Sequence, residues 1–195
     1  MISISRNPEA AANKSFDIII VGGGIYGAML LLHATQQDQR VLLLERGDFG
    51  SETSYNSLRI IHGGLRYLQT LDIIRFHQSV TERQWFLSTF PDLVKPMPCL
   101  MPLYNKGAKR PGILKAALML NDMLSARRNR GVNHSHSIEN GRILNAKETR
   151  KIFPGVVDTG LTGSALWYDA HAPDTQRIIM ETIKWACSIG GHAFN

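Results

Sequence analysis

Residues 16–46 read FDIIIVGGGIYGAMLLLHATQQDQRVLLLER, and this stretch decides the fold. The apolar run 16–21 predicts a buried strand, a glycine-rich turn follows it, and residues 28–33 open a helix. Residues 41–44 predict a second buried strand, which Glu45 closes. This order of strand, turn, helix and strand predicts an α/β domain of the Rossmann type.

Three glycines in the turn have the spacing G-x-G-x-x-G, and each has a physical reason. Gly22 permits a tight turn, Gly24 lets the backbone approach a pyrophosphate, and Gly27 lets the helix pack closely on the sheet. The N–H groups and the positive end of the helix dipole then face the phosphates. Glu45 offers a carboxylate to two ribose hydroxyl groups and would repel a 2′-phosphate, which argues against NADP. The alternative interpretation is a tight turn without a ligand.

The composition excludes several classes of protein. The residues are 44% hydrophobic and 19% charged, which is typical of a soluble globular protein. The length of 195 residues suffices for one domain or for one domain with a smaller appendage. Cys99 and Cys187 lie far apart, and His134 and His136 have no third ligand nearby, so we expect no disulfide framework and no metal site. The first 15 residues lack the apolar segment of a secretory signal, and no run of about 18 apolar residues predicts a membrane span. We therefore expect a cytoplasmic protein.

The net charge of +6 is concentrated in residues 106–130, where the carboxylate of Asp122 alone opposes a group of cations. These cations are Lys106, Lys109, Arg110, Lys115, Arg127, Arg128 and Arg130. Such a run favours an anionic partner, although a solvated face is the simpler interpretation. Residues 112–126 have helical periodicity, and they predict either a core helix with basic ends, which we favour slightly, or a helix lying on an anionic membrane. In the second case the contact would be peripheral, on the inner face of the cytoplasmic membrane. No nucleic-acid partner is expected.

Residues 59–68 read RIIHGGLRYL, a more unusual stretch than the loop before it, because His62 and two glycines stand between apolar residues. The paired glycines Gly63 and Gly64 predict that another backbone or a flat ligand approaches closely. An isolated histidine is more often a satisfied core residue than a catalyst, but these neighbours make His62 a candidate. The preceding loop 48–54 is rich in hydroxyl groups, and it either closes over a second phosphate or is a plain surface loop.

The phrases GGGIYGA (22–28), LLLERGDFGSETS (42–54) and SLRIIHGGLRYLQ (57–69) together resemble the N-terminal part of the FAD-dependent glycerol-3-phosphate dehydrogenases. This family lies within the D-amino-acid-oxidase-like flavoprotein superfamily. The later phrase ALWYDAHAPDTQR (165–177) is similar to a further segment of the same family, so the resemblance covers almost the whole chain. Tyr26 and Arg59 depart from the asparagine and lysine that the family often has.

The resemblance implies FAD as the cofactor and gives roles to particular residues. Gly22, Gly24 and Gly27 would meet the pyrophosphate and Glu45 the adenosine ribose. Thr53 and Ser54 would close on the phosphates. The full set of implied cofactor-binding residues is Gly22, Gly24, Gly27, Glu45, Arg46, Thr53, Ser54, Ser57, His62, Gly63 and Gly64, of which Ser57 and the last three would line the approach to the isoalloxazine ring. His62 is the candidate catalytic residue.

The resemblance also implies a reaction. In the family, sn-glycerol 3-phosphate is oxidised to dihydroxyacetone phosphate, hydride passes to flavin N5, and the electrons go on to a quinone or another acceptor. The chain is shorter than these enzymes, and no arginine that clamps the substrate phosphate is identified in it. One alternative is another oxidoreductase of the superfamily that acts on a hydroxy acid or an amine. A second alternative is a truncated, non-catalytic fragment that binds nucleotide weakly or not at all.

The expected organisation is a Rossmann-like FAD-binding domain with the beginning of an α+β substrate or cap domain. Its segments are a tail (1–15), the first segment of the FAD-binding domain (16–90), part of the substrate domain (91–164) and a truncated return segment towards the FAD-binding domain (165–195). The boundary is placed near Pro91, because prolines at 91, 96, 98 and 102 break this stretch into extended pieces. An amphipathic helix over 72–89, a short helix capped by Asn145, a strand over 165–168, a helix over 175–188 and the start of a strand after it complete the prediction.

Overall fold

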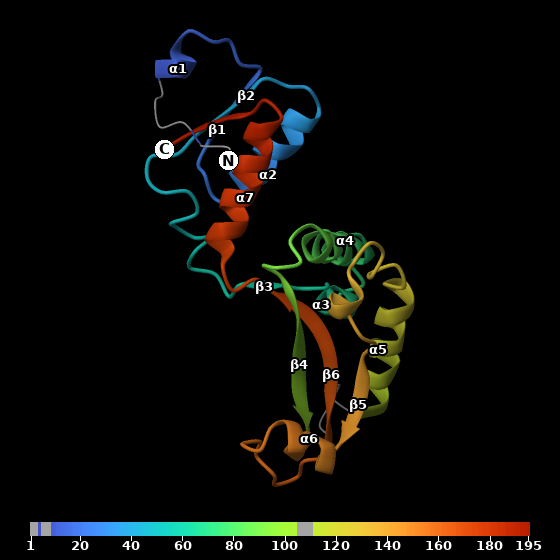
Figure 1. Ribbon diagram of the computed structural model, residues 1–195. Helices are drawn as coiled ribbons and strands as arrows, with labels where there is room; N and C mark the ends of the chain where they lie inside the picture. The colour runs from blue at the N-terminus through green and yellow to red at the C-terminus, as the bar shows by residue number, and fades with distance from the viewer. Residues whose placement is uncertain (1–3, 5–8, 105–110) are drawn as a thin grey trace. The chain divides into compact units, whose positions relative to one another are not determined.

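The computed structural model describes residue 4 and residues 9–104 and 111–195. Lys106, Lys109 and Arg110 of the basic stretch lie outside the described residues. The chain forms two compact units, and each is described by itself. Unit 1 comprises Met1–Arg59 and Pro173–Asn195, and unit 2 comprises Ile60–Ala172 (Figure 1).

Unit 1 contains a parallel sheet in the order β1 (Ile18–Val21), β2 (Val41–Leu44) and β7 (His192–Phe194). Helix α2 (Ile25–Gln36) connects β1 to β2, and helix α7 (Thr175–Ser188) leads into β7 and packs against α2. The register pairs Ile18 with Val41 and Leu42 with His192. The order of strand, turn, helix and strand predicted for residues 16–46 is therefore confirmed, as is the α/β class. The first strand was expected to be buried, but β1 is largely exposed: Ile19 and Val21 are 60% and 85% exposed, and in the described sheet β1 pairs with β2 alone.

The core of unit 1 is built from the apolar faces of these elements. Helix α7 buries Ile178, Ile179, Thr182, Ile183 and Ala186, a stripe with the spacing of one helical face. The segment expected to be a tail contains the short helix α1 (Glu9–Ala12), whose Ala11 packs with Leu42 and Phe194. Part of the expected tail thus contributes to the core.

Unit 2 is an antiparallel sheet covered by helices. Its longest strands, β6 (Gly163–His171) and β4 (Lys95–Leu103), pair along their whole length, and β6 also pairs with β3 (Ile60–Ile61) and β5 (Arg142–Asn145). The helices are α3 (Leu65–Gln69), α4 (Ile73–Thr89), α5 (Pro111–Leu124), the 3₁₀ helix η2 (His134–His136) and α6 (Ala146–Ile152). This unit has the α+β organisation that the sequence predicted for a second domain.

The prolines of β4 do not divide the strand. In the described sheet β4 pairs with β6 alone, so it lies at an edge. Pro96, Pro98 and Pro102 occupy alternate positions, and alternate residues direct their backbone nitrogen atoms to the same side of a strand. The missing N–H groups can therefore all lie on the free edge, where no partner strand needs them. The sequence had predicted separate extended pieces, and the structure joins them into one strand.

The division into units differs from the boundaries expected near residues 90 and 165. Residues 60–90 belong to unit 2, because β3 pairs with β6 and because Arg83 of α4 forms an ion pair with Asp169 of β6. The whole of β6 also lies in unit 2. These contacts join segments more than 80 positions apart in the sequence, which local patterns do not reveal.

Two helices expose apolar side chains that the sequence had assigned to the core. Ile73 and Ile74 at the start of α4 are exposed, although Phe76, Val80 and Leu87 of the same helix are buried as expected. In α5, Leu118 is the one fully buried residue among those described. Helix α5 packs one face on β5 and β6 and exposes the other, so the packing expected of a core helix holds for one face alone. None of the described helices is both long and apolar enough to cross a membrane.

Candidate functional sites in the two units

The glycine turn after β1 has the geometry expected of it. Gly22 adopts φ +109°, a conformation that side-chain-bearing residues rarely adopt. A Cβ atom on Gly27 would overlap the carbonyl oxygen of Gly22 and would lie 3.2 Å from Cδ1 of Leu43 in β2. Gly22 therefore permits the turn, and Gly27 permits the close packing of α2 on the sheet.

Helix α2 begins at Gly24, which is its N-cap residue. The N–H of Ile25 donates to Oγ of Ser54 at 3.0 Å, so the hydroxyl-rich loop closes over the helix N-terminus. A Cβ atom on Gly24 would lie 3.1 Å from the same oxygen. The Ser54 hydroxyl keeps its own hydrogen as a donor for an anion at this helix end.

Glu45 is held by two backbone N–H groups. Its Oε2 accepts from Gly23 at 2.7 Å and its Oε1 accepts from Gly47 at 2.8 Å. These two bonds lower the pKa of the Glu45 carboxyl below its ordinary value. Each carboxylate oxygen has a second lone pair, so an ionised Glu45 can still accept hydrogen bonds from two ribose hydroxyl groups.

The turn, the helix end and Glu45 line a single cavity of about 620 Å³. Its lining includes Gly22, Gly24, Gly27, Glu45, Arg46, Thr53 and Ser54. A Cβ atom on Gly22 would meet no other atom within 4 Å, so the backbone is open to a ligand at that point. A cavity with a helix N-terminus, unshielded backbone and a fixed carboxylate fits the pyrophosphate and ribose of a dinucleotide such as FAD.

Ser57 and Arg59 stabilise the end of this loop. The Ser57 hydroxyl donates to the carbonyl of Ser54 at 3.2 Å and accepts from the N–H of Arg59 at 3.3 Å. The guanidinium of Arg59 lies 5.3 Å from the centre of the Tyr55 ring and donates to the carbonyl of Pro173 at 2.8 Å. A lysine would lack the planar group that makes both contacts, so the departure of Arg59 from the family pattern has a local structural role.

The second candidate site is the turn His62-Gly63-Gly64 in unit 2. A Cβ atom on Gly63 would overlap the guanidinium of Arg83. Gly64 has φ +78°, and its Cβ would lie 3.1 Å from the carbonyl oxygen of Phe76 in α4. The close approach predicted from the paired glycines is therefore confirmed. The backbone that approaches is that of α4 at Gly64, and the group that approaches Gly63 is the Arg83 side chain.

Asp169 anchors this turn to the sheet. Its Oδ1 accepts from the N–H of Gly63 at 2.7 Å and from Nη1 of Arg83 at 3.2 Å. Arg83 also donates to the carbonyl of Tyr168 at 2.6 Å. The Arg83 side chain is buried and that of Asp169 is 13% exposed. Burial lowers the pKa of Arg83, while the charge of Asp169 opposes that shift. A buried cation of this kind needs a nearby anion.

Neither Arg83 nor Asp169 is among the site residues predicted from the sequence. A signal for Arg83 was present, because Phe76, Val80, Arg83 and Leu87 follow the spacing of one helical face. An arginine in the apolar stripe of a helix indicates a buried partner. Asp169 was matched to the family phrase, but its partners come from residues 63 and 83, and no local pattern predicts that pairing.

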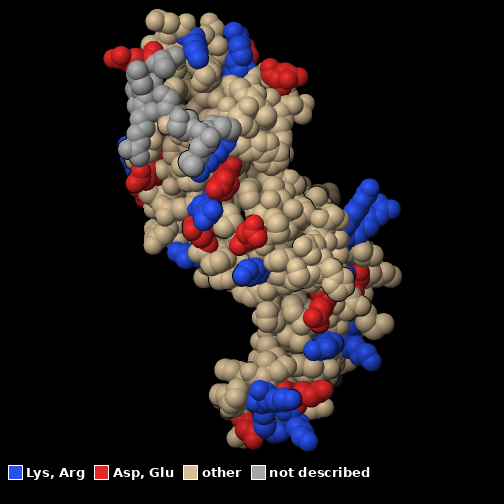
Figure 2. Space-filling model, viewed as in Figure 1, with Lys and Arg blue, Asp and Glu red and all other residues tan. Residues whose placement is uncertain are grey.

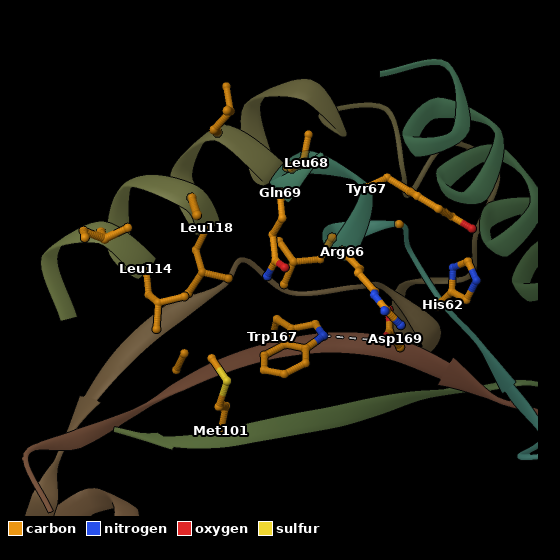
Figure 3. A pocket seen from close by; sticks show the side chains of 16 residues that line it. His62, Arg66, Tyr67, Leu68, Gln69, Met101, Leu114, Leu118, Trp167 and Asp169 are labelled. Atoms are coloured by element: carbon orange, nitrogen blue, oxygen red, sulfur yellow. Dashed lines mark hydrogen bonds between the residues drawn. The ribbon is translucent and has the colours of Figure 1, made fainter. Parts of the chain in front are cut away.

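A cavity of about 710 Å³ lies beside this turn, between the helices α3 and α5 and the strands β4 and β6. Figure 3 shows His62, Arg66 and Asp169 towards one end and Leu114, Leu118 and Met101 towards the other. Nε1 of Trp167 donates to Oδ2 of Asp169 at 3.3 Å, and the His62 ring contacts the edge of Tyr67 at 5.8 Å between centroids. The cavity thus has a polar end and an apolar end.

The structure divides the expected site residues between the two cavities. The glycines of the turn with Glu45, Arg46, Thr53 and Ser54 line the cavity in unit 1. His62 and Gly64 line the cavity in unit 2, and Gly63 supports it through Asp169. Arg66 of α3 also lines the second cavity, and Figure 3 shows its side chain directed towards Asp169. Arg66 is not among the predicted site residues, although it lies in the phrase IHGGLRYL.

Known proteins resemble this chain over almost its full length. The family model described as FAD dependent oxidoreductase matches residues 17–195. The glycerol-3-phosphate dehydrogenase of Synechocystis sp. is 30% identical over 190 residues, which are 97% of this chain and 33% of that protein. The alpha-glycerophosphate oxidase of Lactococcus lactis is 32% identical over 186 residues, covering 94% of this chain and 29% of the relative. The chain therefore spans about a third of the length of these curated relatives.

Solved structures confirm the fold. The glycerol-3-phosphate dehydrogenase from Bacillus halodurans, complexed with FAD, matches with a TM-score of 0.64 and 21% identity over 96% of this chain and 27% of that chain. The L-alpha-glycerophosphate oxidase from Mycoplasma pneumoniae, with FAD bound, matches with a TM-score of 0.63 and 19% identity over 92% of this chain and 44% of that chain. These matches bear out the Rossmann-like fold, and the curated relatives bear out the family resemblance.

Proposed function

Because the chain belongs to the FAD dependent oxidoreductase family, we propose that unit 1 binds FAD and that unit 2 receives sn-glycerol 3-phosphate for oxidation to dihydroxyacetone phosphate. The observation that carries the proposal is the single cavity of unit 1, where the glycine turn, the N-terminus of α2 and the fixed Glu45 carboxylate lie together. The names of the curated relatives support the substrate. The domain roles follow from this assignment: unit 1 is the FAD-binding part and unit 2 belongs to the substrate domain.

The residues of unit 1 have separable tasks. The dipole of α2 and the hydroxyl of Ser54 attract the pyrophosphate, and Gly22 and Gly24 leave room for it. Glu45 accepts hydrogen bonds from the adenosine ribose. FAD, when bound, accepts a hydride from the substrate carbon that carries the hydroxyl group. Arg46 is exposed at the rim of the cavity and adds positive charge there.

The polar end of the cavity in unit 2 supplies groups that suit a phosphorylated alcohol. The Arg66 guanidinium can form charge-assisted hydrogen bonds with the phosphate. His62 can accept the proton of the substrate hydroxyl group, as a general base does. Tyr67 and Trp167 provide aromatic walls that limit the access of water. In this proposal Arg66 is the arginine that binds the substrate phosphate, a residue that the sequence patterns left unassigned.

The test is to purify the chain, record its visible spectrum and add sn-glycerol 3-phosphate without oxygen. A flavin spectrum that bleaches on addition supports both parts of the proposal. A colourless chain contradicts FAD binding by this chain alone. A flavin that is bleached by a hydroxy acid or an amine, and not by sn-glycerol 3-phosphate, identifies the alternative oxidoreductase. The electron acceptor is assigned by whether a short-chain quinone or oxygen restores the colour faster.

A second part of the proposal is peripheral contact of unit 2 with an anionic membrane. Helix α5 exposes Lys115, Met119 and Met123 at intervals of four residues, and Arg127 follows at the next interval. Figure 2 shows Lys and Arg side chains on the side of unit 2 that carries α5. Arg128, by contrast, is buried and forms an ion pair with Asp122, so it does not contribute to this surface. Exposed apolar side chains flanked by cations suit the boundary of an anionic bilayer.

This contact is tested by sedimentation with vesicles. We expect the chain to sediment with phosphatidylglycerol vesicles and to remain in solution with phosphatidylcholine vesicles. The double substitution Met119→Ser and Met123→Ser should reduce the bound fraction severalfold, because the lost apolar contacts contribute to binding. The matched control is Met97→Ser in the half-buried part of β4. Equal binding by the double variant and the wild type would contradict the proposal.

A further inference from the structure

We propose that Asp169 is the positioning residue of the cavity in unit 2: it fixes the peptide between His62 and Gly63 and the indole of Trp167 at the polar end. The identity of the ligand in this inference rests on the proposed function. The positioning itself rests on contacts within unit 2.

Both oxygens of Asp169 are engaged by donors from separate parts of unit 2. Oδ1 accepts from the Gly63 N–H at 2.7 Å and from Arg83 at 3.2 Å. Oδ2 accepts from Nε1 of Trp167 at 3.3 Å and lies 3.8 Å from Sγ of Cys99. Trp167 lines the cavity, and Gly63 lies between His62 and Gly64, which also line it. A single side chain thus connects the turn of His62 with the floor of the cavity (Figure 3).

The chemistry of these partners requires a carboxylate. An ionised Asp accepts hydrogen bonds at both oxygens and donates none. The side chain of Asn would place an NH₂ group against either the Gly63 N–H or the Trp167 N–H, so one of these donors would lose its acceptor. The buried Arg83 would also lose its compensating charge. Asp169→Asn therefore keeps the shape of the side chain, but it replaces one hydrogen-bond acceptor by a donor and removes the negative charge.

Another aspartate of unit 2, Asp122, also contacts a glycine N–H and a buried arginine. Asp122 accepts from the N–H of Gly141 at 2.9 Å and lies 3.6 Å from Nη2 of the buried Arg128. Asp122 is not among the residues that line the cavity of unit 2. Asp122→Asn therefore disturbs a comparable glycine N–H and a comparable buried cation while leaving the polar end of the cavity in place.

The experiment compares Asp169→Asn with Asp122→Asn in the full chain, without added FAD. The readouts are the NMR resonances of the His62 imidazole and the Trp167 Nε1–H, assigned with His62→Gln and Trp167→Phe, and titration with sn-glycerol 3-phosphate. We expect Asp169→Asn to shift both resonances and to weaken binding about tenfold, the effect of one lost directed interaction. We expect Asp122→Asn to lower stability while leaving both resonances and the affinity near those of the wild type. Equal effects of the two substitutions on the resonances would overturn the proposal.

A measurement on the wild type keeps the proposal testable if Asp169→Asn fails to fold. The Gly63 amide and the Trp167 Nε1 proton should exchange with solvent at least tenfold more slowly than the exposed Gly112 amide and the Trp185 Nε1 proton. Rapid exchange of the Gly63 amide would overturn the positioning role. The two proposals can fail separately. If the chain binds neither FAD nor sn-glycerol 3-phosphate, the proposed function is contradicted. If Asp169→Asn still shifts the His62 and Trp167 resonances in that chain, the positioning role is supported.

Discussion

Gly24 and Gly27 lie in the same turn, but their surroundings would respond differently to a methyl group. The Cβ of Gly27→Ala would overlap the backbone of Gly22, which cannot move aside, so we expect the free energy of unfolding to fall by about 3 kcal/mol. The Cβ of Gly24→Ala would meet the movable Ser54 side chain, and the loss of a favourable N-cap residue costs about 1 kcal/mol.

The two substitutions should also differ in ligand binding. Gly24→Ala places a methyl group where the pyrophosphate would approach, so we expect FAD affinity to fall about tenfold in a chain that remains folded. Urea unfolding and flavin fluorescence titration measure the two effects. A Gly27→Ala chain with wild-type stability would show that α2 does not pack on the sheet as described.

Glu45 makes the stability of unit 1 depend on pH, and the direction of that dependence follows from the pKa of Glu45. The N–H groups of Gly23 and Gly47 stabilise the ionised carboxylate and lower its pKa below the ordinary 4.5. Its stabilising contribution is therefore present above pH 4.5 and is lost as the pH falls through the lower value in the folded state. Glu45→Gln should remove this part of the acid sensitivity, which urea midpoints measured across the acid range would reveal. Identical acid profiles for the two proteins would contradict the assignment.

The start of helix α6 is set by its N-cap residue, Asn145. The Asn145 side chain accepts from the N–H of Glu148 at 2.9 Å, and the Glu148 side chain accepts from the N–H of Asn145 at 2.8 Å. Asn145→Ala removes this reciprocal cap, so we expect the free energy of unfolding to fall by about 1 kcal/mol. Lys147→Ala, an exposed substitution in the same helix, is the control. Urea unfolding should separate the two, and equal losses would show that the cap contributes nothing specific.

Local patterns predicted the elements that carry a clear periodicity or cap in their own sequence. The strand 41–44 and the helix 175–188 have the bounds that periodicity gave, and the cap of α6 lies at the predicted Asn145. The strands β3 and β5 were not predicted, because neither contains the run of four apolar residues that marks 41–44, and each exists through pairing with β6. A short strand has little periodicity of its own, so its partner decides it.

At the scale of the whole molecule, the edge of the parallel sheet should govern self-association. Strand β1 has β2 as its partner in the described sheet, and Ile19 and Val21 are 60% and 85% exposed. An exposed apolar edge strand is a site for intermolecular pairing. We expect the chain to associate as its concentration rises and Ile19→Lys to reduce that association, measured by sedimentation velocity. The control is Leu58→Lys, which adds the same charge at an exposed apolar residue outside the sheet and should have little effect on association. If it reduces association as much as Ile19→Lys does, the cause is a general charge repulsion and not the edge of the sheet.

The sequence by itself determined the glycine turn of unit 1 and its surroundings, where we propose that FAD binds. The glycine turn, the helix after it and Glu45 are contiguous in residues 16–46, and the backbone conformation of one short segment brings them together. Tertiary structure alone decided the division at residues 59 and 172, the exposure of α5 and the network around Asp169. In that network, residues 63, 83 and 169 meet through an antiparallel sheet and a helix packed on it. Their burial, and therefore the strength of their charges and hydrogen bonds, exists only after those distant segments have paired.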